Sequence, residues 1–257
     1  MKTIKPLIDG DLLAYKASVG VQKDIYWGDG LYTCHAYLDD AIDNFNQMLN
    51  SIIEHLILMY PDYHMDVPVL CFSDKNNFRK TIFKEYKTNR SGTRKPTCYW
   101  GLVDYIRDNH NSVSMPNLEG DDVLGLLAVS MNSDNTLPII VSLDKDFKTV
   151  PATFYNFGKD EVNTYSKSEA YRNLMVQCLT GDTTDGYSGC SGVGRVTARR
   201  LVDSCSTDEE IWGKVLDKFK RAGHTEDYAL TMVRCAYILH EPEDYSKDGE
   251  VNLFTPK

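Results

Sequence analysis

The sequence has 257 residues, 42% of them hydrophobic, which is enough to bury a full core in one large domain or in a domain with a smaller lobe. No stretch approaches the roughly eighteen apolar residues that cross a membrane, and the apolar run from Ile4 to Ile8 is too short for a signal peptide, so we expect a cytoplasmic protein with no membrane partner. Seven cysteines without a Cys-x-x-Cys pair, and six histidines without zinc-ligand spacing, argue against disulfides and structural zinc.

The net charge of −9 argues against a polyanionic partner for the protein as a whole, but the charge is unevenly distributed. A basic segment extends from residue 79 to residue 95 and contains a single acid, Glu85. Its bases are Arg79, Lys80, Lys84, Lys87, Arg90, Arg94 and Lys95. Because Gly92 and Pro96 interrupt any long helix, we expect this segment to be exposed and mobile.

Three apolar runs predict buried strands, and aspartates follow each of them. Lys5 to Ile8 leads to Asp9, Val67 to Phe72 leads to Asp74, and Leu137 to Leu143 leads to Asp144 and Asp146. In an open parallel α/β sheet, ligands bind outside the carboxyl ends of the strands. We therefore expect these carboxylates to converge in one crevice.

A further group of acids opens a helix with a buried face that begins at residue 118. Asp121 and Asp122 fit its first turn, where the helix dipole favours anions, and Asp122 could be a ligand or simply a residue of the helix start. A capped helix start does not also account for Glu119. Asp11, near the first strand, is open in the same way between a helix N-cap and a ligand.

The remaining pattern predicts scaffold elements. A helix is expected at 12–19, a hairpin at 24–37, helices at 38–60, 99–107 and 170–179, edge strands at 153–157 and 162–165, and two helices at 207–221 and 225–240. Between these, Asp182 and Asp185 precede a glycine-rich turn that enters a basic helix at Arg195. Backbone N–H groups at such a helix start suit a phosphate. The polar residues from Glu241 are expected to be loosely held.

If these carboxylates share one crevice, their repulsion requires cations. At 4 Å, two unit charges repel by roughly 4 kcal/mol at an effective dielectric constant near 20. Mg2+ and Mn2+ prefer oxygen ligands, and two such ions about 4 Å apart promote in-line displacement at a phosphate. The acids therefore indicate phosphoester chemistry with two divalent ions.

Four motifs together resemble the phage 5'-3' exonucleases of the flap endonuclease superfamily, of the T-odd coliphage type. They are Phe78-Arg79-Lys80 with Tyr86-Lys87-x-Asn89-Arg90, Glu119-Gly120-Asp121-Asp122, Asp144-Lys145-Asp146-Phe147-Lys148, and the stretch from Gly181 to Gly189. The resemblance implies an α/β fold: a PIN-like (resolvase-like), mostly parallel sheet with flanking helices, plus a C-terminal helical lobe containing a helix-three-turn-helix. It implies a catalytic domain over 1–180 with a basic arch or clamp at about 78–100, a DNA-binding lobe over 181–240 and a tail over 241–257.

The resemblance also implies roles for residues. Asp9, Asp74, Glu119 and Asp121 would surround a first metal ion, and Asp144, Asp146, Asp182 and Asp185 a second. Lys87, Arg79, Arg90 and Asp122 would act in catalysis, with Tyr86 available to stack on a base. Arg94, Lys95, Gly192, Gly194, Arg195, Arg199 and Arg200 would bind DNA, with K+ at the helix-three-turn-helix. The short basic segment departs from a fully helical arch, and Cys190-Ser191 departs from the usual hairpin sequence.

The implied activity is a monomeric Mg2+- or Mn2+-dependent 5'-3' exodeoxyribonuclease with flap endonuclease or RNase H-like activity, which leaves 5'-phosphate and 3'-hydroxyl ends. Its substrates would be double-stranded DNA with 5' ends or flaps and RNA–DNA hybrid, in a phage-infected bacterial cytoplasm. A PIN-type ribonuclease is one alternative. Another is a haloacid-dehalogenase-like phosphatase, since Asp9-Gly10-Asp11 resembles its nucleophile motif. A third is a non-catalytic DNA-binding protein.

Overall fold

The computed structural model describes residues 2–256. Within that range one sheet has the strand order β6-β5-β1-β7-β8-β9, with the short β4 also paired to β1. The strands are β1 (Thr3–Asp9), β4 (His64–Met65), β5 (Val69–Phe72), β6 (Ser112–Ser114), β7 (Thr136–Ser142), β8 (Thr153–Asn156) and β9 (Glu161–Thr164). All pairings are parallel except β8 with β9. The predicted mostly parallel α/β sheet is confirmed.

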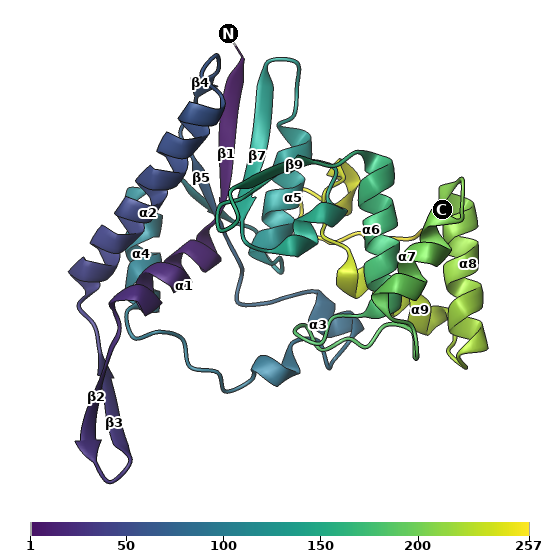
Figure 1. Cartoon of the computed structure of the whole chain (residues 1–257), viewed down its shortest axis with the longest axis horizontal. Coiled ribbons are helices and arrows are strands. Elements are labelled where there is room, and N and C mark those ends of the chain that lie inside the picture. Colours follow the sequence, from purple (N-terminus) through teal and green to yellow (C-terminus); the bar gives the residue numbers. More distant parts are fainter. Residues whose placement is uncertain (1, 257) are drawn as a thin grey trace.

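Helices cover both faces of this sheet (Figure 1). α1 (Gly10–Val21), α2 (Leu38–Met59) and α4 (Tyr99–Asn109) form one layer, and α5 (Gly120–Ser130) and α6 (Lys167–Thr180) lie on the other side. Successive side chains of β5 point to opposite faces of the sheet, so this strand packs against both helix layers. Leu70 and Phe72 belong to the core with α1, α2 and α4, whereas Val69 and Cys71 belong to the core on the other face. No helix within the described residues is long and apolar enough to cross a membrane.

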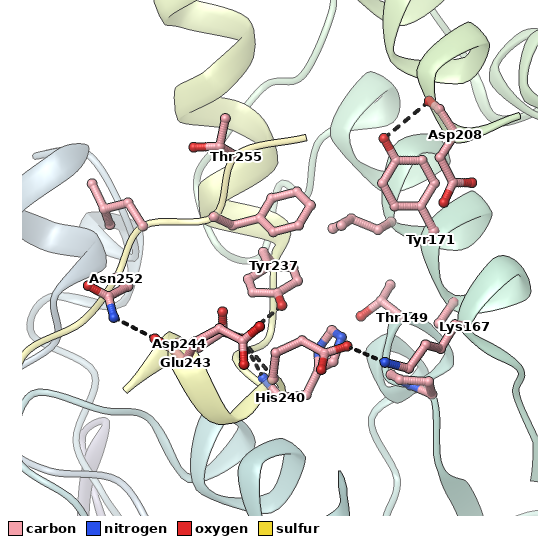
Figure 2. A pocket seen from close by; sticks show the side chains of 16 residues that line it. Thr149, Lys167, Tyr171, Asp208, Tyr237, His240, Glu243, Asp244, Asn252 and Thr255 are labelled. Atoms are coloured by element: carbon pink, nitrogen blue, oxygen red, sulfur yellow. Dashed lines mark hydrogen bonds and ion pairs between the residues drawn. The ribbon is translucent and has the colours of Figure 1, made fainter. Parts of the chain in front are cut away.

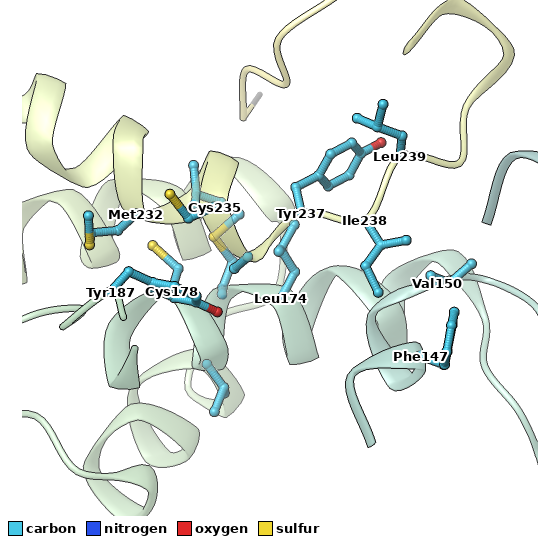
Figure 3. Close-up of a cluster of buried hydrophobic side chains, with 14 of the residues drawn as sticks. Phe147, Val150, Leu174, Cys178, Tyr187, Met232, Cys235, Tyr237, Ile238 and Leu239 are labelled. Atoms are coloured by element: carbon cyan, nitrogen blue, oxygen red, sulfur yellow. The ribbon is translucent and has the colours of Figure 1, made fainter. Parts of the chain in front are cut away.

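The second core continues from the sheet into a lobe of helices. This lobe consists of α7 (Arg195–Asp203), α8 (Asp208–Arg221) and α9 (Glu226–Ala236). Figure 3 shows Leu174 and Cys178 of α6 beside Met232 and Cys235 of α9, in the same buried cluster as Phe147. The sheet and the lobe therefore share one apolar core.

Two predictions for the C-terminal part of the chain are wrong, one about where a helix ends and one about how firmly the tail is held. The last helix ends at Ala236 rather than near His240, because the carbonyl oxygens of Cys235 and Tyr237 accept hydrogen bonds from the buried Arg79 guanidinium. The tail, expected to be loosely held, is docked: Phe254 stacks on Tyr237 with ring centroids 4.1 Å apart, and Arg234 donates to its carbonyl oxygen. The tail includes η3 (Pro242–Asp244) and borders a cavity of about 590 Å³ (Figure 2).

The basic segment is mostly irregular. It contains only α3 (Arg79–Ile82) and η1 (Thr88–Arg90) before the chain reaches α4. Its first half is anchored to the core, contrary to expectation, because Arg79 and Tyr86 are buried, as is the preceding Phe78. Lys80 and Lys84 point to solvent from this half, and every residue from Thr88 to Lys95 is exposed.

Candidate active site

Asp9 lies where β1 meets α1, and two hydrogen bonds hold its carboxylate. Oδ1 accepts from the Leu12 backbone N–H at 3.0 Å as the N-cap of α1, and Oδ2 accepts from Ser142 Oγ at 2.7 Å. Burial, together with the charges of Asp11 and Asp144, raises the pKa of Asp9 to about 6. The fold therefore holds this acid in a place where its charge is costly.

The start of α5 brings Asp121 to the same place. Glu119 is the N-cap of α5 and forms a capping box with Asp122. Burial raises the pKa of Asp121 well above its usual value, and the charges of Asp9 and Asp144 add to the rise. Asp9, Asp121 and Asp144 are thus close enough to repel one another and form one acidic cluster.

Asp146 extends this cluster toward α6. Asp144 caps η2 (Lys145–Thr149) by accepting from the Asp146 backbone N–H at 2.8 Å. Asp146 Oδ2 accepts from Gln177 Nε2 at 2.7 Å, whereas its Oδ1 is buried without a partner. Burial and the charge of Asp144 raise the pKa of Asp146 to about 6. An unpartnered carboxylate oxygen beside further acids is suited to a cation.

Asp182 lies at the edge of the same region. Its Oδ1 accepts from the Thr184 backbone N–H at 2.7 Å, and its Oδ2 is 3.7 Å from Lys145 Nζ. Asp182 also contributes to the raised pKa of Asp146. The structure therefore brings Asp182 near Asp146, as the sequence predicts.

Lys87 supplies a cation between the acids. Its backbone is left-handed, with φ of 55°, and its N–H donates to the Asp185 carbonyl oxygen at 2.8 Å. Its Nζ donates to Glu119 Oε1 and lies 3.6 Å from Asp185 Oδ2. Burial opposes its charge, but Glu119 and Asp185 outweigh burial and raise the pKa of Lys87. Burial likewise opposes the charge of Glu119, yet Lys87 and Arg79 lower the pKa of Glu119 to about 2. Both groups are ionised at neutral pH.

Tyr86 and Arg90 hold Asp185 beside this pair. The Tyr86 hydroxyl lies 2.9 Å from Glu119 Oε2 and 3.0 Å from Asp185 Oδ2, and Arg90 Nη2 donates to Asp185 Oδ1 at 2.7 Å. The Tyr86 ring is only 2% exposed and stacks on Tyr187. Its burial does not fit the predicted stacking on a base, because the phenol fills core space and orients carboxylates instead.

Arg79 and Asp122 form an ion pair buried behind the acidic cluster. Arg79 Nη1 and Nη2 each donate to a different Asp122 carboxylate oxygen at 2.7 Å, and the two side chains are 2% and 0% exposed. Asp122 Oδ1 also accepts from the Leu239 backbone N–H at 3.0 Å. This geometry gives both residues a positioning role in place of the predicted catalytic one, since neither side chain faces solvent.

Asp74 and Asp11 face backbone and hydroxyl donors. Asp74 accepts from the Asn117 backbone N–H at 2.9 Å, and backbone hydrogen bonds lower the pKa of Asp74. Asp11 accepts from the Ser73 backbone N–H at 2.7 Å and from the Tyr99 hydroxyl at 2.8 Å. The N-cap of α1 is therefore Asp9, not Asp11, while Asp74 lies at the rim of the cluster.

A cavity of about 730 Å³ opens over these acids. Asp9, Asp121 and Asp144 line its floor, and Arg94 and Lys95 of the basic segment also line it. Among residues 2–256, no three acidic, histidine or cysteine side chains already stand in the arrangement of a metal site. The cavity thus joins an acidic floor to a basic rim.

The glycine-rich turn depends on close backbone approach. A Cβ on Gly189, whose φ is +65°, would lie 2.3 Å from the Gly181 nitrogen, so only glycine fits. The turn ends at Gly194, the N-cap of α7, after Gly192 with φ of 75°. Arg195 at the start of α7 and Arg200 in its last turn are exposed, whereas Arg199 donates to Asn173 Oδ1 at 2.7 Å.

Sequence reasoning did not single out Ser142 and Gln177, which orient Asp9 and Asp146. Both are buried polar residues, Ser142 in the apolar strand β7 and Gln177 on the buried side of α6. A polar side chain on the buried face of such an element needs a hydrogen-bond partner, and that signal was available in the sequence.

A family model described as the 5'-3' exonuclease, N-terminal resolvase-like domain, matches residues 5–175. The chain belongs to the 5'-3' exonuclease family. It is therefore a nuclease that hydrolyses phosphodiester bonds, and the alternative of a haloacid-dehalogenase-like phosphatase is wrong.

This 5'-3' exonuclease is 28% identical to the exodeoxyribonuclease of enterobacteria phage T3, over 98% of this chain and 92% of the relative. Its fold is similar to a T5 5'-exonuclease structure with divalent metal ions (zinc) bound, with a TM-score of 0.65, 13% identity, and coverage of 91% and 89% of the two chains. It is also similar to a bacteriophage T5 flap endonuclease in a complex with DNA and metal ions, with a TM-score of 0.55, 11% identity, and coverage of 91% and 99%.

Proposed function

We propose that this 5'-3' exonuclease degrades double-stranded DNA from 5' ends, and cuts 5' flaps, with two divalent cations held in the acidic cluster. The observation that carries the proposal is the convergence of Asp9, Asp121 and Asp144 in a cavity that Arg94 and Lys95 also line, with Asp146 beside Asp121 and Asp144 in a smaller pocket. The phage T3 relative is an exodeoxyribonuclease, and the T5 structures contain divalent metal ions and, in one case, DNA.

The donor set fits hard cations. Asp146 offers a buried oxygen without a partner, and burial raises the pKa of Asp9, Asp121 and Asp146, so each would gain from a nearby positive charge. Asp9, Glu119 and Asp121, with Asp74 at the rim, would hold one ion. Asp144, Asp146, Asp182 and Asp185 would hold the other. A site in which every ligand is a carboxylate oxygen favours Mg2+ or Mn2+.

When bound, the two ions would lower the pKa of an attacking water and stabilise the leaving oxygen. Side chains of the protein would position and stabilise the scissile phosphate. Lys87 stays protonated because Glu119 and Asp185 raise its pKa, so its ammonium can donate to an oxygen of the scissile phosphate. Arg90, about half exposed beside Asp185, can reach the same phosphate. Products would carry 5'-phosphate and 3'-hydroxyl ends.

Binding of the duplex is assigned to the lobe and to the cavity rim. Gly192 and Gly194 expose backbone N–H groups before α7, and Arg195 and Arg200 are exposed on it, a combination suited to duplex phosphates and, in a helix-three-turn-helix, to K+. Arg94 and Lys95 would contact the cleaved strand. RNA–DNA hybrid as a second substrate, a monomeric state and a phage-infected cytoplasm belong to the same proposal.

A flap duplex labelled at either the 5' or the 3' end tests this function. We expect short products to be released from the 5' end with Mg2+ or Mn2+ and none with EDTA. An Asp144→Asn variant should lose cleavage yet bind the duplex at least as tightly, because it removes repulsion of phosphate. Metal-independent cleavage, or full activity of this variant, would refute the two-metal site. Cleavage of RNA alone would favour the PIN-type ribonuclease.

A further inference from the structure

The hairpin formed by β2 (Lys23–Gly28) and β3 (Leu31–His35) projects away from the layered body (Figure 1). Its side chains are unusually apolar for an exposed element: Tyr26, Trp27, Leu31 and Tyr32 are each about 60% exposed. An exposed aromatic hairpin promotes aggregation unless it serves an interaction. The hairpin is therefore a candidate binding surface.

The cross-strand register divides this surface into two faces. Tyr26 pairs with Tyr32 and Asp24 with Cys34, so these four residues share one face, and the two tyrosine rings lie 4.7 Å apart. Ile25, Trp27 and Thr33 occupy the other face, where the Trp27 indole N–H donates to Thr33 Oγ1 at 2.8 Å. We call the first the tyrosine face.

The chain segment that lines the cavity also contacts the base of the hairpin. Thr97, two residues beyond Lys95, directs its hydroxyl toward Cys34 Sγ at 3.7 Å, and its backbone N–H donates to Gln22 Oε1 at 3.0 Å. The irregular segment that contains Arg94 and Lys95 and lines the cavity therefore passes the base of the hairpin on the side of Cys34. A strand that followed this segment beyond Lys95 would reach the tyrosine face.

Aromatic side chains also line the cavity between the acids and the hairpin. Tyr15 and Trp100 both line it, and Lys95 Nζ lies 4.4 Å from the centroid of the Tyr99 ring. Gly101, next to Trp100, packs against Leu38 at the start of α2, immediately after the hairpin. Aromatic rings and cations thus line the same cavity, a combination that proteins use to bind single strands.

The charge of the hairpin itself narrows the choice of partner. Lys23 is opposed by Asp24 and Asp29, so the hairpin does not attract phosphates and its contribution must come from its rings. A duplex hides the faces of its bases except at its end, whereas a single strand offers every base for stacking. The chemistry that fits is unpaired nucleotides whose phosphates are held by Arg94 and Lys95.

We propose that the tyrosine face binds the unpaired strand of the substrate by base stacking on Tyr26 and Tyr32. This inference rests on the proposed function, because it extends the same cavity. The test is the affinity of a labelled oligothymidylate and of a blunt duplex, measured by fluorescence anisotropy in EDTA with the full chain.

A Tyr26→Val/Tyr32→Val double variant removes the rings and keeps strand-favouring residues. It should bind oligothymidylate at least roughly five-fold more weakly, the lower limit for one lost stack, and bind the duplex normally. Its dependence on salt should be unchanged. An Arg94→Ala/Lys95→Ala variant should instead show a shallower salt dependence, because it removes phosphate contacts. Tyr26→Phe/Tyr32→Phe should bind like the parent, and Ile25→Ser, on the opposite face, is the matched surface control.

Equal losses for single strand and duplex, or no loss for either, would overturn the proposal. Light scattering measures the oligomeric state and tests whether the tyrosine face instead forms a dimer interface. A dimeric parent and a monomeric valine variant would mean that the hairpin joins two copies of the chain and would overturn the proposal. Cleavage of a blunt duplex is followed in parallel with Mn2+. An inactive parent that still binds oligothymidylate through the tyrosines would refute the proposed function while leaving the binding surface intact.

Discussion

Replacing Asp146 by asparagine should stabilise the fold in the absence of divalent ions while abolishing activity. The carboxylate is held beside Asp144 with one oxygen buried and unpartnered, and its pKa rises from 3.8 to about 6. Since each pKa unit corresponds to about 1.4 kcal/mol, ionised Asp146 costs the metal-free fold ~3 kcal/mol at neutral pH. Asparagine removes this charge and can keep the hydrogen bond from Gln177.

The direction in which stability changes with pH follows from the number of protons bound in the folded and unfolded states. Between pH 4 and about 6 the folded state retains a proton that the unfolded state has lost, so the stability of the parent falls as the pH rises through this window. Thermal unfolding in EDTA should therefore show the Asp146→Asn variant more stable at pH 8, by roughly 6–12 °C in Tm, and similar to the parent at pH 4. Mg2+ should stabilise the parent much more than the variant.

Asp134, which is exposed, provides the control, and its asparagine variant should unfold like the parent at both pH values. A variant at Asp146 that is no more stable than the parent at pH 8, or whose advantage does not change with pH, would show that the acidic cluster is not electrostatically strained.

Three further predictions concern the surroundings of the cluster. Asp122→Asn removes the carboxylate that pairs with both nitrogens of the buried Arg79 guanidinium, leaves only the longer ion pair with Glu119, and should lower the free energy of unfolding by roughly 3–5 kcal/mol in denaturant titrations. Lys87→Ala should lower kcat by roughly two to three orders of magnitude in single-turnover cleavage, with little change in duplex affinity. Gly189→Ala should destabilise the protein more than Gly192→Ala, because both have positive φ but only Gly189 lacks room for a Cβ, and calorimetry can compare them.

Each of these has a distinct contradicting result. Lys84 is exposed in the same basic segment, so a Lys84→Ala variant as slow as Lys87→Ala would point to general charge rather than to a specific contact. Full stability of Asp122→Asn would mean that Arg79 is not confined by its partners. Equal losses for the two glycine variants would assign the cost to backbone conformation alone.

Local patterns in the sequence determined much of this protein. Apolar runs identified β1, β5 and β7, and the aspartates after them indicated that Asp9 and Asp144 would meet at one edge of a parallel sheet. These inferences succeed because burial of both faces makes a strand continuously apolar, and because parallel strands share one carboxyl-end edge. The α/β class and the nuclease family follow from such short-range features and are confirmed.

Only the tertiary structure decided the roles of residues whose partners are distant in the chain. Arg79 stands in a basic segment, and its sequence neighbours predict a surface residue near the substrate. It is buried because Asp122 and the carbonyl oxygens of Cys235 and Tyr237, up to 158 residues away, surround its guanidinium. Tyr86 is buried by the same convergence. A side chain's solvent exposure depends on what the rest of the chain packs against it, and local sequence does not contain that information.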